Sequence, residues 1–139
     1  ICRKRANAKI NNLNEIEVWG DGNQTRSFLF IEDCVDATLD LFDSNFNGPI
    51  NIGSEEQVSI NQMIEIIEEI AEYKVSKKYN LNMPVGVRGR SSNNEKIQKE
   101  LKWTPKYNLR KGLENTYGWI YNMIKNQRNE INVFTQGNN

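Results

Sequence analysis

The chain has 139 residues, which is enough for one domain with a modest core. Its 18 lysines and arginines balance its 18 aspartates and glutamates, so the net charge gives no indication of binding to nucleic acid or to an anionic membrane. The sequence contains no histidine, which excludes a histidine-dependent catalytic triad and a histidine-ligated zinc ion within this chain.

Two strands are predicted near the amino terminus, one on each side of a turn. Residues 15–19 alternate polar and apolar side chains, and residues 26–31 alternate in the same way. Residues 20–23, with the sequence GDGN, lie between these strands and are typical of a turn. Judged on this local pattern alone, the segment is a β-hairpin.

A helix is predicted after the second strand. Asp33 is a residue type that caps helices, and apolar side chains follow it at helical spacing, namely Val35, Leu39 and Phe42. The segment 43–49 is rich in residues that break helices, so we expect the helix to end there. A short strand is predicted over residues 50–54.

The strongest helix signal begins at Ser59. Ser59 and Gln62 have the spacing of a capping box, in which each side chain accepts a hydrogen bond from the other residue's backbone N–H. The apolar side chains that follow form one helical stripe, which consists of Ile60, Met63, Ile64, Ile67, Ile70 and Ala71. We therefore expect this helix to pack on the core.

The last third of the chain is predicted to begin with a strand over residues 75–79 and a loop over residues 80–92. A short helix follows, which Asn93 caps and which ends near Leu101. A final helix runs from about residue 109 to about residue 127. Its predicted core face consists of Leu113, Tyr117, Ile120 and Ile124.

The asparagine-rich segment 128–139 is predicted to be a flexible tail. The mixture of short strands and helices in the rest of the chain predicts the α/β class. Strand and helix signals do not alternate regularly enough for a complete doubly wound sheet, so we expect an incomplete one.

The segment 20–28 is the first candidate for a binding site. It begins like a dinucleotide fingerprint, but Thr25 stands where the third glycine belongs, and the segment is predicted to join two strands. One interpretation is a hairpin turn with a solvated Arg26. The other is a ligand site, in which Gln24, Thr25 and Arg26 offer hydrogen-bond donors and one permanent cation to a phosphate.

A second candidate is the segment 86–92, which holds Arg88 and Arg90 among small neighbours. Glycine lets the backbone approach an anion closely, and a guanidinium group can bind two phosphate oxygens at once. A diphosphate would suit this arrangement. The alternative interpretation is a surface loop with ordinary solvated arginines.

The pattern Tyr-x-x-x-Lys occurs three times, and short-chain dehydrogenases use this pair to lower the pKa of a phenol for proton transfer. The pairs are Tyr73 and Lys77, Tyr107 and Lys111, and Tyr121 and Lys125. Only the last pair lies within one predicted helix, where it stands beside a core stripe. We interpret all three as coincidence and predict no catalytic residue and no metal ligand in this chain.

The two cysteines indicate a reducing compartment. Cys2 and Cys34 lack the spacing of a metal site and the density of a disulfide framework, so we expect a cytoplasmic protein. No apolar run approaches the roughly 20 residues of a membrane-spanning helix, so no membrane partner is expected.

Seven motifs occur in the order found in the extended short-chain dehydrogenase/reductases that act on nucleotide sugars, and the chain resembles this superfamily over about residues 1–127. The motifs are Trp19-Gly20-Asp21-Gly22, Gln24-x-Arg26-x-Phe28, Ile31-x-Asp33, Asn51-Ile52-Gly53-Ser54, Gly86-x-Arg88-Gly89-Arg90, Leu101-x-Trp103-x-Pro105 and Gly112-Leu113-x-x-Thr116. Within the superfamily the chain is most similar to the GDP-mannose epimerases, through residues 2–4, 19–28 and 86–90.

The resemblance implies roles for particular residues. The residues that match those lining the GDP-sugar site are Lys4, Gln24, Thr25 and Arg26. Arg90 matches the arginine that binds the diphosphate, and Arg88 is a further candidate. Asp33, which also belongs to one of the matching motifs, stays assigned to helix capping.

The resemblance also implies a fold and an activity. The expected fold is the C-terminal, substrate-binding part of an extended Rossmann-type short-chain dehydrogenase/reductase, in which residues 51–53 lie at the edge of the cofactor-domain sheet. NAD and the catalytic residues would lie upstream of Ile1, so this chain alone is expected to be inactive. The expected partners are a GDP-sugar and, in the intact enzyme, a second copy in a homodimer.

The implied reaction is an NAD-dependent epimerisation, with oxidation at C4 of the sugar, epimerisation at C3 and C5, and reduction at C4. An alternative within the enzymes is a UDP- or dTDP-sugar 4-epimerase, 4,6-dehydratase or decarboxylase. Outside the enzymes, the alternatives are a non-catalytic nucleotide-sugar-binding module and a structural or dimerisation domain whose arginines are solvated.

Overall fold

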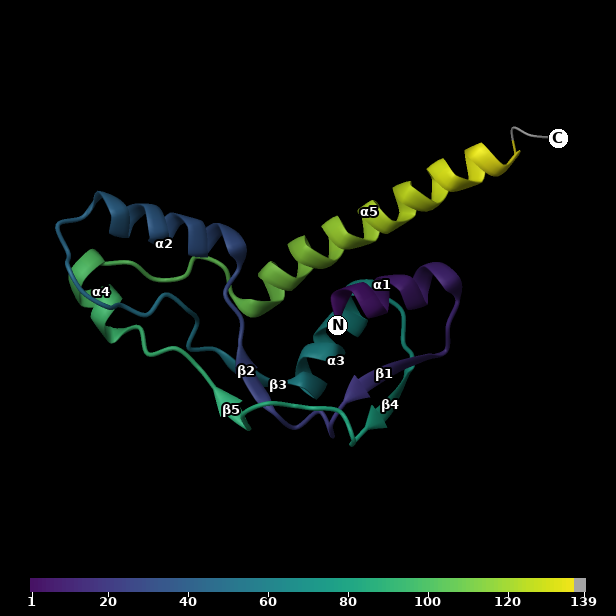
Figure 1. Cartoon of the computed structure of the whole chain (residues 1–139), viewed down its shortest axis with the longest axis horizontal. Coiled ribbons are helices and arrows are strands. Elements are labelled where there is room, and N and C mark those ends of the chain that lie inside the picture. Colours follow the sequence, from purple (N-terminus) through teal and green to yellow (C-terminus); the bar gives the residue numbers. More distant parts are fainter. Residues whose placement is uncertain (137–139) are drawn as a thin grey trace.

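The structure is a computed structural model that describes residues 1–136, with side-chain surroundings for residues 1–128. Figure 1 shows helices and short strands mixed along the chain. In chain order the elements are α1 (Cys2–Asn11), β1 (Glu15–Trp19), β2 (Thr25–Ser27), α2 (Ile31–Asp43), β3 (Gln57–Ser59), α3 (Ile60–Ala71), β4 (Ser76–Asn80), β5 (Gly89–Arg90), α4 (Glu95–Leu101) and α5 (Leu109–Gln136). The predicted α/β class is confirmed.

The strands of the described residues form two small sheets. In one, β1 pairs in parallel with β4, and Glu15 lies opposite Ser76. In the other, β2 is the central strand, antiparallel to β3 and parallel to β5. The predicted hairpin is therefore wrong, because β1 and β2 belong to different sheets. The backbone groups of β1 are satisfied by a strand more than fifty residues away, which local turn signals do not indicate.

The core lies where α1, α3 and α5 pack together (Figure 1). It contains the predicted face of α5 and the predicted stripe of α3 except Ile64, which packs on β1 in a neighbouring cluster. Its buried residues are Ala6, Met63, Ile67, Ala71, Leu109, Leu113 and Tyr117. Burial of apolar surface of this kind is the main stabilising contribution to a domain. The capping box is also confirmed, because Ser59 Oγ accepts from the Gln62 N–H and Gln62 Oε1 accepts from the Ser59 N–H.

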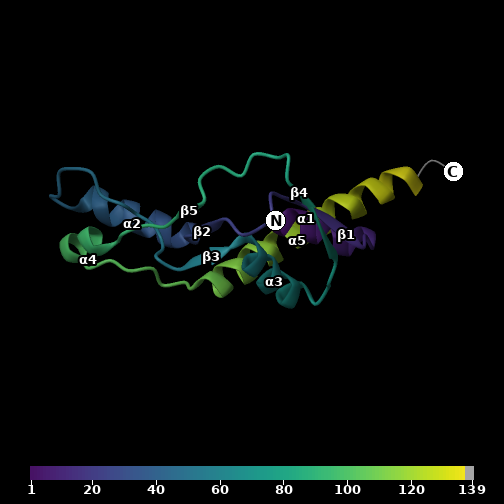
Figure 2. The ribbon, with the colours of Figure 1, turned by 90° about the horizontal axis from the view of Figure 1, so that it is seen from below.

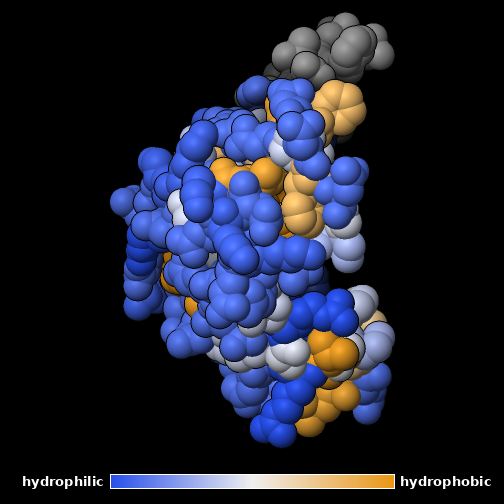
Figure 3. All heavy atoms as spheres, turned by 90° about the vertical axis from the view of Figure 1, so that its left-hand side faces the viewer, coloured by the Kyte–Doolittle hydropathy of each residue, from blue (hydrophilic) through white to orange (hydrophobic). Residues whose placement is uncertain are grey.

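A separate cluster holds α2 and α4, which lie at the opposite end of the molecule from α1 (Figure 1). Its buried residues are Ala37, Ile97 and Trp103. Viewed from this end, the surface is mostly hydrophilic, with smaller hydrophobic patches between the charged and polar residues (Figure 3). The outer face of α2 contributes exposed apolar side chains, namely Ile31, Val35, Leu39 and Phe42.

Asp33 does not cap α2, and this prediction is wrong. The helix begins at Ile31 after Phe30, which makes no side-chain cap, so Asp33 lies inside the first turn. Its buried carboxylate accepts hydrogen bonds from the backbone N–H groups of Lys106 at 2.9 Å and Tyr107 at 3.0 Å. Asp33 therefore ties α2 to the segment that leads into α5, more than seventy residues along the chain.

Several predicted boundaries also differ from the structure. The strand predicted over residues 26–31 is only the three-residue β2, because α2 already begins at Ile31. No strand is assigned over residues 50–54, and the nearby strand is β3. The predicted strand over residues 75–79 is confirmed as β4, but the predicted loop 80–92 contains β5.

The last two helices keep their predicted starts with small changes. Asn93 Oδ1 accepts the N–H of Glu95 at 3.0 Å, but Asn94 is the residue that directly precedes α4. Helix α5 continues past the predicted end near residue 127 to Gln136. The rest of the segment predicted to be a flexible tail, residues 137–139, lies outside the described residues.

Replacing the buried carboxylate tests its structural role. We expect Asp33→Ala to lower the free energy of unfolding by at least about 2 kcal/mol, because two backbone N–H groups lose a charged acceptor. Urea unfolding of the purified protein measures this loss. The matched control is Asp36→Ala on the same helix, which removes only an exposed ion pair with Lys106 and should cost less than about 1 kcal/mol. Equal losses for the two variants would contradict the assignment.

Candidate functional site

Pairing of β2 with β5 brings the two predicted binding segments together. Thr25 lies opposite Gly89 and Arg26 opposite Arg90, and the Thr25 N–H donates to the carbonyl of Arg88 at 2.9 Å. The segments 24–26 and 88–90 are therefore neighbours, although more than sixty residues separate them in the sequence. Gly89 permits this approach, because a Cβ at that position would lie 2.8 Å from Thr25 Oγ1.

Side chains of the first segment are fixed by bonds to backbone carbonyls. Gln24 Nε2 donates to the Trp19 carbonyl at 3.0 Å, and Arg26 Nη2 donates to the Val85 carbonyl at 2.9 Å. Arg26 thereby holds the segment between β4 and β5, which runs along the far side of the molecule from α3 and α4 (Figure 2). Among the described residues, Gln24 Oε1 is buried without a hydrogen-bond partner, while the Nε2 group of the same side chain is the one that donates to Trp19.

A hollow of about 410 Å³ lies beside these residues. Lys4 from α1, Gln24 and Arg26 line it together, with Glu17 and Trp19 from β1. Lys4 Nζ donates to the Glu17 carbonyl at 2.9 Å and lies 5.8 Å from the centre of the Trp19 ring. Three of the six residues that we predicted from the sequence thus share one hollow.

The other three predicted residues lie next to this hollow without lining it. Thr25 is in β2. The exposed Arg88 directly precedes β5, and the exposed Arg90 lies in β5. Within the part of the chain whose side chains are described, Arg26, Arg88 and Arg90 take part in no ion pair. The paired strands β2 and β5 and the segment before β5 therefore carry three arginines with no bonded carboxylate, which suits an anion with several oxygens.

Asp21 is an acidic residue in the turn before β2, and its carboxylate is bound by the neighbouring Asn23. The backbone N–H of Asn23 and then its side-chain amide donate to the Asp21 carboxylate and lower its pKa, and the positive charge of Arg88 adds to this effect. Asp21 thus stays ionised and folds the turn between β1 and β2. Its carboxylate does not form an ion pair with the guanidinium group of Arg88.

Glu17 and Trp19 line the hollow but were not predicted as site residues from the sequence. A signal was available, because alternation along the strand over residues 15–19 places side chains 17 and 19 on one face. Only the packing of α1 decides that this face meets Lys4.

The three Tyr-x-x-x-Lys pairs lie away from the hollow and make other bonds. Tyr73 donates its hydroxyl to the Leu13 carbonyl, and Lys9 lies over the ring of Tyr121. The Tyr107 hydroxyl donates to Glu32 at 2.7 Å, and this bond raises the pKa of Tyr107. Proton transfer by a tyrosine needs the pKa shifted in the opposite direction.

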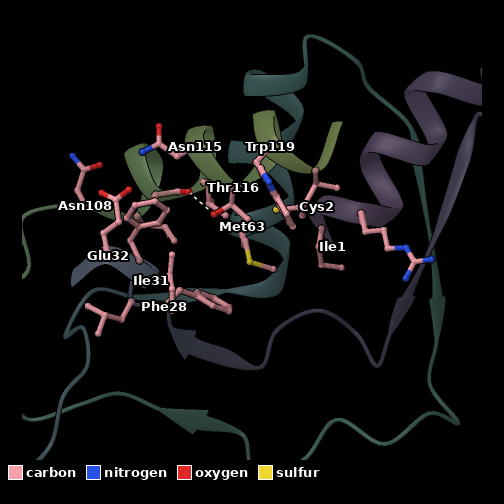
Figure 4. A pocket seen from close by; sticks show the side chains of 17 residues that line it. Ile1, Cys2, Phe28, Ile31, Glu32, Met63, Asn108, Asn115, Thr116 and Trp119 are labelled. Atoms are coloured by element: carbon pink, nitrogen blue, oxygen red, sulfur yellow. Dashed lines mark hydrogen bonds between the residues drawn. The ribbon is translucent and has the colours of Figure 1, made fainter. Parts of the chain in front are cut away.

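A larger hollow of about 910 Å³ lies between α1, α5 and the segment 28–32 (Figure 4). Figure 4 shows apolar side chains such as Phe28, Met63 and Trp119 facing one another across it. It contains none of the six predicted residues. Volume alone would favour this hollow as a binding site, but we place the candidate site at the smaller one, because Lys4 and Arg26 line it and the β2–β5 pairing brings Arg88 and Arg90 next to it.

Neither a metal site nor a membrane span is found in the described part of the chain. No group of three or more acidic or cysteine side chains there could hold a metal ion. No helix there combines the length and the apolar character needed to cross a bilayer.

Solved structures of known function share this fold. UDP-glucuronic acid 4-epimerase from Bacillus cereus, solved with UDP-glucuronic acid and NAD, is 27% identical, with a TM-score of 0.78 over 88% of this chain and 40% of that one. This likeness confirms that the fold is part of an extended Rossmann-type short-chain dehydrogenase/reductase.

The chain belongs to the family described as GDP-mannose 4,6 dehydratase, whose model matches residues 1–116. It is 42% identical to GDP-mannose 3,5-epimerase of Arabidopsis thaliana over 127 residues, 91% of this chain and 32% of the relative. It is 33% identical to GDP-L-fucose synthase 1 of the same plant over 129 residues, 91% of this chain and 39% of that relative. The chain thus spans about a third of the length of these curated relatives.

Gly20 offers a test of how the hollow is built. Its φ is +73°, and a Cβ there would lie 2.3 Å from Val85 Cγ1, so Gly20→Ala should displace the segment that Arg26 holds. We expect the free energy of unfolding to fall by at least about 1 kcal/mol, measured by urea titration. Gly118→Ala on α5 is the control, because nothing lies near its Cβ and helix propensity should stabilise it by about 0.5–1 kcal/mol. A neutral Gly20→Ala would refute this packing.

Proposed function

We propose that this chain is the substrate-binding portion of a nucleotide-sugar epimerase, and that the enzyme is GDP-mannose 3,5-epimerase. The observation that carries the proposal is the pairing of β2 with β5, which gathers Arg26, Arg88 and Arg90 next to the hollow that Lys4 lines. The 42% identity to the plant epimerase supports the choice of GDP-mannose.

In this proposal the arginines bind the diphosphate of the substrate. A guanidinium group presents N–H donors in a planar fork that matches two phosphate oxygens, and it stays charged at any physiological pH. Arg90 is the principal ligand and Arg88 the second. Thr25 and Gln24 add neutral hydrogen bonds, and Lys4 places a cation on the α1 side of the hollow, where the rest of the nucleotide would lie. These contacts would hold the sugar at a fixed place for the reaction.

The proposed reaction oxidises the C4 hydroxyl of the mannose, exchanges the protons at C3 and C5, which a C4 ketone makes acidic, and then reduces C4 again, with NAD carrying the hydride. Residues 20–23 do not form an NAD-binding loop, because they join two strands instead of leading into a helix. In this proposal NAD and the acid/base groups are bound by other parts of the intact protein. Location in the cytoplasm and assembly as a homodimer remain predictions.

A second candidate is an enzyme that acts on a UDP-sugar. The observation in its favour is the likeness to UDP-glucuronic acid 4-epimerase, whose solved complex contains a UDP-sugar. The two candidates differ in the base that the protein prefers.

Base preference is therefore the first test. We expect calorimetry of the intact protein to give a GDP affinity at least about tenfold above the UDP and dTDP affinities, a difference of about 1.4 kcal/mol. Incubation with GDP-mannose should yield the epimerised GDP-sugar. A preference for UDP would refute the assignment to GDP-mannose, and binding without turnover would support a non-catalytic binding module.

Removal of Arg90 tests the diphosphate site. We expect Arg90→Ala in the intact protein to weaken GDP binding by at least about 1.5 kcal/mol, because the diphosphate loses a charge-assisted hydrogen bond. The matched control is Arg110→Ala, which removes another exposed arginine that pairs with Glu69 outside the hollow. Unchanged GDP affinity in Arg90→Ala, measured by calorimetry, would refute the site.

A further inference from the structure

Glu17 is the acidic residue of the hollow, and a diphosphate site does not explain it. It lines the same hollow as Lys4 and Arg26, where its carboxylate would repel a phosphate. It is held firmly, because Asn80 Nδ2 donates to Oε1 at 2.8 Å and Trp19 Nε1 donates to Oε2 at 3.0 Å. The bond from Asn80 ties β4 to β1 and at the same time fixes a carboxylate beside the candidate binding site.

The bonding of Glu17 leaves room for a ligand. The hydrogen bond from Asn80, and then the one from Trp19, lower the pKa of Glu17, so the side chain is an ionised, acceptor-only group. A carboxylate has about four acceptor positions, and these two donors occupy only two of them. Lys4 Nζ lies 3.7 Å from Oε2, so a cationic donor stands next to the free acceptor positions.

We propose that Glu17 selects the base of the nucleotide, by accepting the N1–H and the 2-amino N–H of guanine while Lys4 donates to O6. This inference rests on the proposed function, since it assumes that a nucleotide occupies the hollow. It goes further by naming a residue that determines specificity.

The chemistry of the bases favours guanine over its competitors. Guanine presents two adjacent donors and then an acceptor along one edge, which complements a carboxylate next to an ammonium group. Uracil presents a single N–H between two carbonyl oxygens, and these oxygens would face the Glu17 carboxylate. Adenine presents an unprotonated ring nitrogen, which would also repel it. Specificity of this kind comes as much from rejecting wrong partners as from binding the right one.

The position of Glu17 agrees with this role. Glu17 and Trp19 come from β1 and Lys4 from α1, whereas the guanidinium groups come from β2 and from the end of the β4–β5 segment. The hollow therefore has one side at β1 with both a carboxylate and an ammonium group, and a basic side at β2. A nucleoside diphosphate has the same division, with hydrogen-bond donors on its guanine and negative charge on its phosphates.

The test is Glu17→Gln in the intact protein, with calorimetric titrations of GDP, UDP and xanthosine diphosphate. We expect GDP affinity to fall at least about tenfold, because the amide N–H would face the donors of guanine. Xanthine carries a carbonyl where guanine carries its 2-amino group, so the glutamine amide can donate to it while accepting from N1–H. The variant should therefore bind xanthosine diphosphate more tightly than the wild-type protein does, and misfolding would not produce such a gain.

The matched control is Glu15→Gln, on the same strand two residues earlier. Glu15 lies near Lys78 and does not line the hollow, so its variant should keep the wild-type order of affinities. A Glu17→Gln protein that still prefers GDP to the same extent, with no gain for xanthosine diphosphate, would overturn the inference and leave the proposed function standing. A wild-type protein that binds no guanine nucleotide would overturn both.

Discussion

The parallel pairing of β2 with β5 is the constraint on which the candidate site depends. It consists of only two residue pairs, Thr25 with Gly89 and Arg26 with Arg90. Strand β2 can serve as the centre of the sheet because β3 satisfies its other edge. Without this pairing, the basic segment 86–90 would be a surface loop, which is the alternative that its local sequence also allowed.

Helix α1 supplies the other wall of the hollow, and its packing decides where Lys4 lies. The neighbouring Arg5 is fully buried, forms an ion pair with Glu68 of α3, and donates to the Tyr73 carbonyl. Burial lowers the pKa of Arg5, and the carboxylate of Glu68 opposes this shift. Removing either partner would leave a buried charge unpaired, so this pair fixes the rotation of α1. Lys4 is thereby directed outwards, over β1.

Charged side chains are unevenly distributed around the candidate site, even though the whole chain has no net charge. Three arginines lie in or beside β2 and β5 without a bonded carboxylate among the described residues, while Glu17 lies at β1 between hydrogen-bond donors. A net charge of zero excludes a long-range attraction to polyanions, but it does not exclude local separation of positive and negative side chains within the site. A small ligand that carries both donors and negative charge fits this arrangement better than a simple anion does.

The sequence by itself determined the local features, because their signals lie within a few residues. These features are the capping box at Ser59, the apolar stripes of α3 and α5, the turn at residues 20–23 and the two segments with arginines. Tertiary structure alone decided which partners meet. Asp33 is a residue type that caps helices, yet its carboxylate binds the backbone of the segment before α5. Strand β1 pairs with β4 and not with β2. The physical reason is that a buried carboxylate or an open strand edge must be satisfied by some partner, but short-range patterns do not specify a partner sixty or seventy residues away.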